Sequence, residues 1–163
     1  MLDAINKMPE VLDSMQENDC SRSKGVNITA GKDYVLGFMF SEDHDHVVVI
    51  EKNKPEWQKG KLNVPGGKVD SGEKPIEAVI REFREETGYE TRSGDWSHFA
   101  RMVSMSLDDP FVVDCFVTTG DVQLVSTTAE ERVMLLHMGD ISNLCHKTIE
   151  NLPWLLHMAL GHL

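Results

Sequence analysis

The chain has 163 residues, of which 40% are hydrophobic, and both values suit one globular domain with a buried core. Its formal net charge of −11 argues against a general nucleic-acid-binding protein, which needs a basic surface to meet phosphates. The charge does not exclude a phosphate-bearing substrate, because bound divalent cations can reverse the local sign.

Residues 1–30 are expected to form an extension to the main domain. Apolar residues at helical spacing, among them Leu2, Ile5 and Leu12, predict a partly helical segment that Pro9 interrupts. No apolar run approaches the roughly 18 residues that span a membrane, and no basic segment precedes an apolar core as in a signal peptide. Three widely spaced cysteines without a CxxC pair favour reduced thiols. We therefore expect a cytoplasmic protein.

Residues 31–163 are expected to form one domain of strands and two helices. Apolar, β-branched runs between turn residues predict the strands, and apolar residues at helical spacing predict the helices. The expected strands cover 33–40, 46–52, 62–64, 98–107, 111–120 and 132–139, and the expected helices cover 75–87 and 147–161. The first two strands are expected to form a hairpin. This order of elements suggests an α+β domain in which a mixed sheet lies between helices.

A cluster of glutamates lies within the expected helix over 75–87. Glu82, Glu85 and Glu86 fall within an arc of about 100° on one side of that helix. Like charges at this spacing cost a few tenths of a kcal/mol per pair in an isolated helix. A hard cation among the oxygens would offset that cost, and carboxylates with open water positions suit Mg²⁺ or Mn²⁺. The alternative is a solvated acidic face that Arg81 and Arg84 stabilise.

The glutamates belong to a longer pattern, Gly67-x5-Glu73-x7-Arg81-Glu82-Phe83-x-Glu85-Glu86-x-Gly88-Tyr89. This pattern resembles the signature of the Nudix hydrolases, which cleave nucleoside diphosphates linked to another group. Tyr89 stands where the family usually has Ile, Leu or Val. The resemblance implies a Nudix-type α/β/α sandwich with a mixed sheet, and a metal-dependent hydrolase that uses Mg²⁺ or Mn²⁺. It extends more weakly over about 33–160.

The resemblance also implies roles for individual residues. Glu85 and Glu86 would be the principal metal ligands, and Glu82 would be a further ligand or the base for water. Arg81 would orient the carboxylates, and the carbonyl of Gly66 would complete the coordination. Glycine in this loop allows the backbone to come close to metal and substrate. The expected substrate-binding residues are Asn63, Gly67, Lys68 and Asn151.

Carboxylates outside the Glu82–Glu86 cluster are further candidates. Many relatives use a carboxylate from a loop before the last strand as base or ligand, and Glu130 and Glu131 occupy such a loop here. A solvated turn is the alternative for both. Glu73 is balanced between a metal role and a staple that joins the loop to the start of the helix.

Two asparagines lie in stretches that resemble base pockets of purine triphosphatases. Asn63 falls on a base-contacting asparagine of the oxidised-purine enzymes, although Leu62 replaces the tryptophan that precedes it there. Asn151 occupies the place of a purine-reading asparagine in MutT-type enzymes. An Asn side chain donates and accepts at once, which suits a purine edge, and local capping is the alternative. Trp57 could stack a base, whereas Trp154, at the start of an apolar helix, is expected in the core.

The resemblance indicates the reaction class and leaves the leaving group open. Motifs that mark the ADP-ribose, dinucleoside polyphosphate, coenzyme A and NADH enzymes are absent, which favours a (d)NTP or oxidised purine triphosphate hydrolysed to NMP and pyrophosphate. Open alternatives are an NDP-sugar or ADP-ribose hydrolase, an RNA 5′-end pyrophosphohydrolase, which the charge of −11 disfavours, and a non-catalytic nucleotide-sensing module. The expected partner is a small-molecule nucleotide, without nucleic acid or membrane, and a homodimer is left open.

Overall fold

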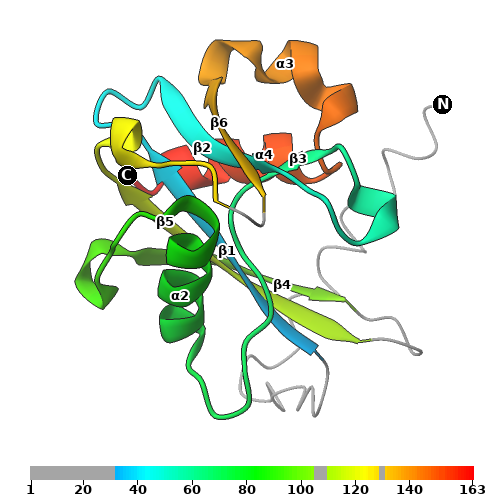
Figure 1. Cartoon of the computed structure of the whole chain (residues 1–163), viewed down its shortest axis with the longest axis vertical. Helices are drawn as coiled ribbons and strands as arrows, with labels where there is room; N and C mark the ends of the chain where they lie inside the picture. The colour runs from blue at the N-terminus through cyan, green and yellow to red at the C-terminus, as the bar shows by residue number, and fades with distance from the viewer. Residues whose placement is uncertain (1–31, 105–109, 129–130) are drawn as a thin grey trace, which may run out of the picture.

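The computed structural model describes residues 32–104, 110–128 and 131–163. The helix expected near the N-terminus and the candidate Glu130 lie outside these residues, so the boundary between extension and domain stays a prediction. The described chain forms a six-stranded sheet with helices on both faces (Figure 1). The sheet mixes parallel and antiparallel pairs, which confirms the expected α+β class.

All six expected strands are present, although some bounds differ. They are β1 (Lys32–Phe40), β2 (His46–Glu51), β3 (Leu62–Asn63), β4 (Ser97–Ser104), β5 (Phe111–Thr119) and β6 (Arg132–His137). Five strands lie in the order β3-β2-β1-β5-β4, and β6 pairs with β2. β1 and β5 run parallel over their full length, whereas the other pairs are antiparallel.

β1 and β2 form the expected hairpin only at its tip, where Phe40 pairs with Val47. Farther along, the segment 65–67 lies beside β1 in place of β2. Gly67 accepts a hydrogen bond of 2.9 Å from the Val35 N–H, and Pro65 accepts one of 2.8 Å from the Gly37 N–H. This pairing fixes the loop that contains Gly66 and Gly67, here called the glycine loop, on the sheet next to the helix that follows it.

α2 covers Pro75–Thr87, as the sequence predicts. Proline suits the first turn because it has no N–H to satisfy there, and Gly88 ends the helix with a φ of 71°, a conformation that glycine adopts readily. Val79 and Phe83 are fully buried against the sheet, and Phe83 meets Trp96 edge to face at 5.2 Å. The acidic side of α2 is therefore directed away from this core.

The last helix is shorter than expected. α4 covers Leu152–Leu160, whereas the sequence predicted a helix over 147–161. Pro153 is tolerated only in a first turn, so the helix begins just before it. The Ile149 N–H instead donates to the Leu62 carbonyl at 3.0 Å and holds this segment against β3. Two short elements precede it, namely α3 (Ile141–Leu144) and a 3₁₀ turn (Cys145–Lys147).

Two cores cover the two faces of the sheet. One packs Phe38 and Phe40 beneath α4, and the other packs Val35 beneath α2. The prediction that Trp154 lies in the core is wrong, because its side chain is 60% exposed. The buried stripe of α4 follows helical spacing and leaves position 154 on the outer side. Its members are Leu152, Leu155, Leu156 and Ala159.

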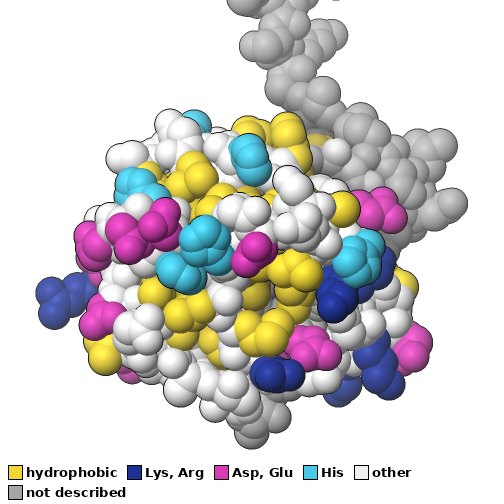
Figure 2. Space-filling model, turned by 90° about the horizontal axis from the view of Figure 1, so that it is seen from above, with side chains coloured by type: hydrophobic (Ala, Val, Ile, Leu, Met, Phe, Trp, Pro, Cys, Tyr) yellow, Lys and Arg dark blue, Asp and Glu magenta, His cyan; other side chains and the backbone are white. Residues whose placement is uncertain are grey.

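The surface of the described chain is mixed in character. On the face in Figure 2, hydrophobic, acidic and histidine side chains are interspersed, and cationic side chains lie mainly toward its margins. This face therefore lacks the continuous basic surface that nucleic-acid binding requires. No helix in the described ranges combines the length and apolar character of a membrane span.

Candidate active site

Glu86 is buried in the last turn of α2, where only 4% of it is exposed. Its Oε2 accepts a hydrogen bond of 2.8 Å from the Gly66 N–H, and its Oε1 lies 3.4 Å from Lys52 Nζ. Burial raises the pKa of Glu86 to about 7, although the Lys52 charge and the Gly66 N–H oppose the rise. A divalent cation beside this carboxylate would favour its charged form.

Lys52 lies between Glu86 and a second buried carboxylate. Its Nζ is 3.1 Å from Glu131 Oε1, and the Asn53 N–H donates to the same oxygen at 3.4 Å. Burial alone would lower the pKa of Lys52, but the two carboxylates outweigh it and the pKa is raised. Glu131 Oε2 is also buried and has no hydrogen-bond partner among the described residues. An orphaned carboxylate oxygen of this kind is suited to bind a cation or a water.

The structure thus brings Glu131 to α2, the signature helix, which carries Glu82, Glu85 and Glu86. β6 pairs with β2 so that Arg132 lies opposite Glu51, and this register places Glu131 beside Lys52. Sequence reasoning missed Lys52. A single lysine directly after a continuous apolar strand is the signal that could have found it, because that strand is buried and its end lies at the edge of the sheet.

Arg81 contacts three of the signature glutamates. Its Nε and Nη2 each donate to Glu73 at 2.9 Å, and Nη1 donates to Glu82 at 2.7 Å and to Glu85 at 3.3 Å. Nη2 also donates to the Lys68 carbonyl at 3.0 Å. The bonds from Arg81 are the main cause that lowers the pKa of Glu73. These contacts favour the reading in which Glu73 joins the loop to the helix and does not bind metal. They also place Arg81 where it can orient the side chains of Glu82 and Glu85.

The glycine loop lies directly against these carboxylates. A Cβ at Gly67 would overlap the carboxylate of Glu82, and a Cβ at Gly66 would overlap the Val35 carbonyl. Only glycine therefore lets the loop come this close to both α2 and β1. The Lys68 side chain is exposed and is not part of the cavity described below.

The donor set of this site fits a hard divalent cation. The carboxylate oxygens gathered here are the kind of ligand that Mg²⁺ and Mn²⁺ prefer, and the Oε2 of Glu131 is one that has no hydrogen-bond partner among the described residues. Within the described ranges, no three acidic, histidine or cysteine side chains already converge on one point. The cations of Arg81 and Lys52 lie among the glutamates instead.

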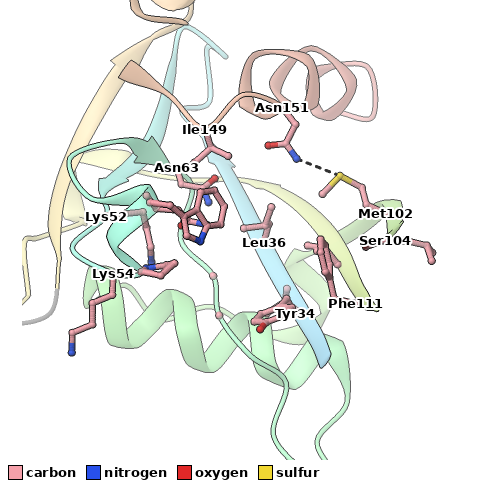
Figure 3. Close-up of a pocket in the computed structure, with 18 residues that line it drawn as sticks. Tyr34, Leu36, Lys52, Lys54, Asn63, Met102, Ser104, Phe111, Ile149 and Asn151 are labelled. Carbon is pink, nitrogen blue, oxygen red and sulfur yellow. Dashed lines mark hydrogen bonds between the residues drawn. The ribbon is translucent and has the colours of Figure 1, made fainter. Parts of the chain in front are cut away.

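A cavity of about 600 Å³ opens beside the glycine loop (Figure 3). Gly66, Gly67 and Lys52 line its polar end. Its apolar wall includes Tyr34, Leu36, Met102, Phe111, Val113 and Ile149. A cavity with this division can hold a ligand that is apolar and planar at one end and anionic at the other.

Both candidate asparagines line this cavity. Asn63 Oδ1 accepts a bond of 2.9 Å from the Val64 N–H, which is the local capping that the sequence left open. Asn151 stands at the N-cap of α4, yet its side chain makes no capping bond. Its Nδ2 lies 3.6 Å from the Met102 sulfur across the cavity (Figure 3). Trp57 also lines the cavity and is 65% exposed.

A family model of the NUDIX domain matches residues 32–141. The chain belongs to the Nudix family. It is 33% identical over 113 residues to the uncharacterised Nudix hydrolase YvcI of Bacillus subtilis, covering 61% of this chain and 63% of that protein. It is 41% identical over 51 residues to a putative 8-oxo-dGTP diphosphatase of B. subtilis, covering 31% of each. The matched regions thus span less than two thirds of these relatives.

Solved structures share the fold at low sequence identity. The NUDIX domain of Shewanella oneidensis NrtR, complexed with ADP ribose, superposes with a TM-score of 0.68 at 17% identity and covers 93% of this chain and 97% of that one. A bifunctional NMN adenylyltransferase/ADP ribose pyrophosphatase of Francisella tularensis, with AMP and a manganese ion, gives 0.66 at 16%, covering 99% and 48%. The MutT protein of Methanosarcina mazei gives 0.65 at 16%, covering 80% and 94%.

Proposed function

We propose that this protein is a metal-dependent pyrophosphohydrolase of nucleoside triphosphates, including oxidised purine triphosphates, and that it releases NMP and pyrophosphate. One observation carries the proposal. A single cavity is lined at one end by the glycine loop beside the signature glutamates, and elsewhere by Asn63 and Asn151. The putative 8-oxo-dGTP diphosphatase among the relatives supports this substrate class.

The phosphates would lie at the end formed by Gly66 and Gly67. Mg²⁺ or Mn²⁺ bound there would neutralise phosphate oxygens and lower the pKa of an attacking water. Glu82, Glu85 and Glu86 would hold it together with the Gly66 carbonyl, and Arg81 would keep these carboxylates oriented. Glu131 would accept the proton of the water or serve as a further ligand through Oε2, which has no partner among the described residues.

The base would occupy the apolar part of the cavity. The exposed indole of Trp57 offers a stacking surface, and Leu36 and Met102 contribute apolar wall. Asn151 would read the base edge, because its amide is not engaged in capping α4. Asn63 would contribute less to recognition, since its Oδ1 is already bonded to the Val64 N–H.

An ADP-ribose hydrolase is the second candidate, because two of the solved structures that share the fold carry ADP ribose or that activity in their names. A screen of nucleotides with Mg²⁺ separates the candidates by their fragments. Pyrophosphate and NMP from triphosphates would support the proposal. AMP with ribose 5-phosphate from ADP-ribose would support the second candidate, and tight binding without turnover would support a nucleotide-sensing module.

A further inference from the structure

Two buried carboxylates from distant segments meet at one ammonium group. Glu86 belongs to α2, Glu131 directly precedes β6, and Lys52 directly follows β2. The side chains of Glu86, Glu131 and Lys52 are only 5%, 8% and 13% exposed. A lysine is rarely buried to this extent unless it is paired, so both carboxylates determine where it lies.

We propose that Lys52 is a positioning residue that holds Glu131 beside the signature helix. This inference rests on the proposed function, because it assigns Glu131 its place in that reaction. Lys52 Nζ and the Asn53 N–H both contact Oε1 of Glu131, at 3.1 and 3.4 Å. Oε2 has no partner among the described residues. The contacts thus fix the carboxylate through one oxygen and leave the other for water or a cation.

Lys54 provides a matched control. It follows the same strand and lines the same cavity as Lys52, but its side chain is exposed. In the described part of the chain, the ion pairs of Glu86 and Glu131 are made by Lys52 and not by Lys54. Of these two lysines, Lys52 is the one that contacts Glu131 in the described part of the chain. Glu131→Gln should therefore shift the melting temperature of the Lys54→Met variant by the same amount as that of the wild type.

A thermal double-mutant cycle in EDTA tests the contact without any turnover. Lys52→Met should lower the melting temperature by roughly 5 °C or more, because two buried carboxylates lose their cation. Glu131→Gln should lower the melting temperature in the wild-type background and raise it in the Lys52→Met background, where it relieves repulsion. The same shift in both backgrounds would overturn the proposal.

Kinetics then test the positioning role. Lys52→Met and Glu131→Gln should each lower kcat about 10²-fold with KM nearly unchanged, and the double variant should be no slower than either single variant. Lys52→Arg, which keeps the charge, should recover most of kcat and also serves if Lys52→Met does not fold. Equal losses in the Met and Arg variants, or multiplicative losses in the double variant, would contradict the role. If the wild type hydrolyses no nucleotide, the proposed function fails, while the thermal cycle still decides whether Lys52 holds Glu131.

Discussion

Asn63 on β3 and Asn151 at the start of α4 line the same cavity, although α2 and three strands separate them in the sequence. The turn before α4 brings them together, because the Ile149 N–H bonds to the carbonyl of Leu62, the residue before Asn63. The two stretches that resemble purine pockets are therefore parts of one site. The two amides differ, because the Oδ1 of Asn63 already accepts a hydrogen bond from the neighbouring Val64 N–H.

Asn151→Ala should raise KM for a purine triphosphate by roughly 2- to 10-fold, the worth of one neutral hydrogen bond, and should leave kcat nearly unchanged. The effect on a pyrimidine triphosphate should be smaller, because a pyrimidine presents a different edge. Steady-state kinetics with both substrates check this. Asn63→Ala should also disturb the glycine loop and lower kcat. Equal losses for Asn151→Ala on every nucleotide would show that Asn151 does not read the base.

Glu82→Gln and Glu85→Gln should each lower kcat by at least about 10²-fold, because each removes a charge from the proposed metal site and keeps the shape. The melting temperature should change by only ~2 °C, since Gln keeps the shape of Glu and both side chains keep contact with solvent, Glu85 at 43% exposure and Glu82 at 17%. Glu77→Gln is the control on the same helix, where Glu77 accepts a hydrogen bond from the Lys74 N–H. If the Glu82 and Glu85 variants unfold yet retain activity per folded molecule, these glutamates are structural.

Gly67→Ala should lower kcat on the order of 10²-fold without unfolding the protein, because the added Cβ displaces the Glu82 carboxylate from its place. Gly94→Ala is the matched control, since a Cβ there meets no atom within 4 Å. Circular dichroism and kcat of both variants make the comparison. Wild-type kcat in Gly67→Ala would show that the close approach of the loop to Glu82 does not matter for turnover.

Asp114 on β5 is buried and accepts hydrogen bonds from Arg101 at 2.9 Å, and it lies 2.7 Å from the His98 ring nitrogen. Burial alone would raise the pKa of Asp114, but bonds from Arg101 and His98 outweigh it and hold the pKa below its ordinary value of 3.8. Because the folded state binds this proton less tightly than the unfolded state, the stabilisation is present above pH 3.8 and is lost as the pH falls through the lower folded pKa.

Asp114→Asn should therefore flatten the loss of stability below pH 4, measured as the free energy of unfolding in urea between about pH 3 and 7. Arg101→Met should cost only about 1 kcal/mol near neutral pH, because solvent screens the exposed Arg101 end of the pair. If the free energy of unfolding of Asp114→Asn falls below pH 4 as steeply as that of the wild type, this carboxylate does not contribute to acid unfolding.

Most of the fold follows from local sequence patterns. Strands with continuous apolar runs, such as β2, and a helix bracketed by Pro75 and Gly88 carry their signals within a few residues. The sequence predicts too long a last helix because the apolar pattern continues before it. In the structure, the Ile149 N–H donates to a carbonyl of β3, so that this segment does not join the helix. Trp154 lies outside the core because the buried side of α4 is set by helical spacing, and hydrophobicity alone does not show which side a residue occupies.

The candidate site likewise contains residues that local sequence patterns predict and residues that only the fold brings together. The signature glutamates and Arg81 could be predicted because one helix and one loop place them. The partners of Lys52 could not be predicted, because Glu86 and Glu131 come to it only through the pairing of β2 with β6 and the packing of α2. The approach of Glu131 to Lys52 depends on the same register, which no local pattern encodes.

The most direct test of the central claim is pyrophosphate release from a nucleoside triphosphate by metal-stripped protein, followed during titration with Mg²⁺ or Mn²⁺. Turnover should be absent in EDTA and should appear with the added cation, because anionic phosphates and carboxylates repel an attacking water-derived nucleophile until a cation neutralises them. NMP and pyrophosphate should form in equal amounts. Full turnover in rigorously metal-free protein would contradict the account, as would no hydrolysis of any nucleotide at saturating cation.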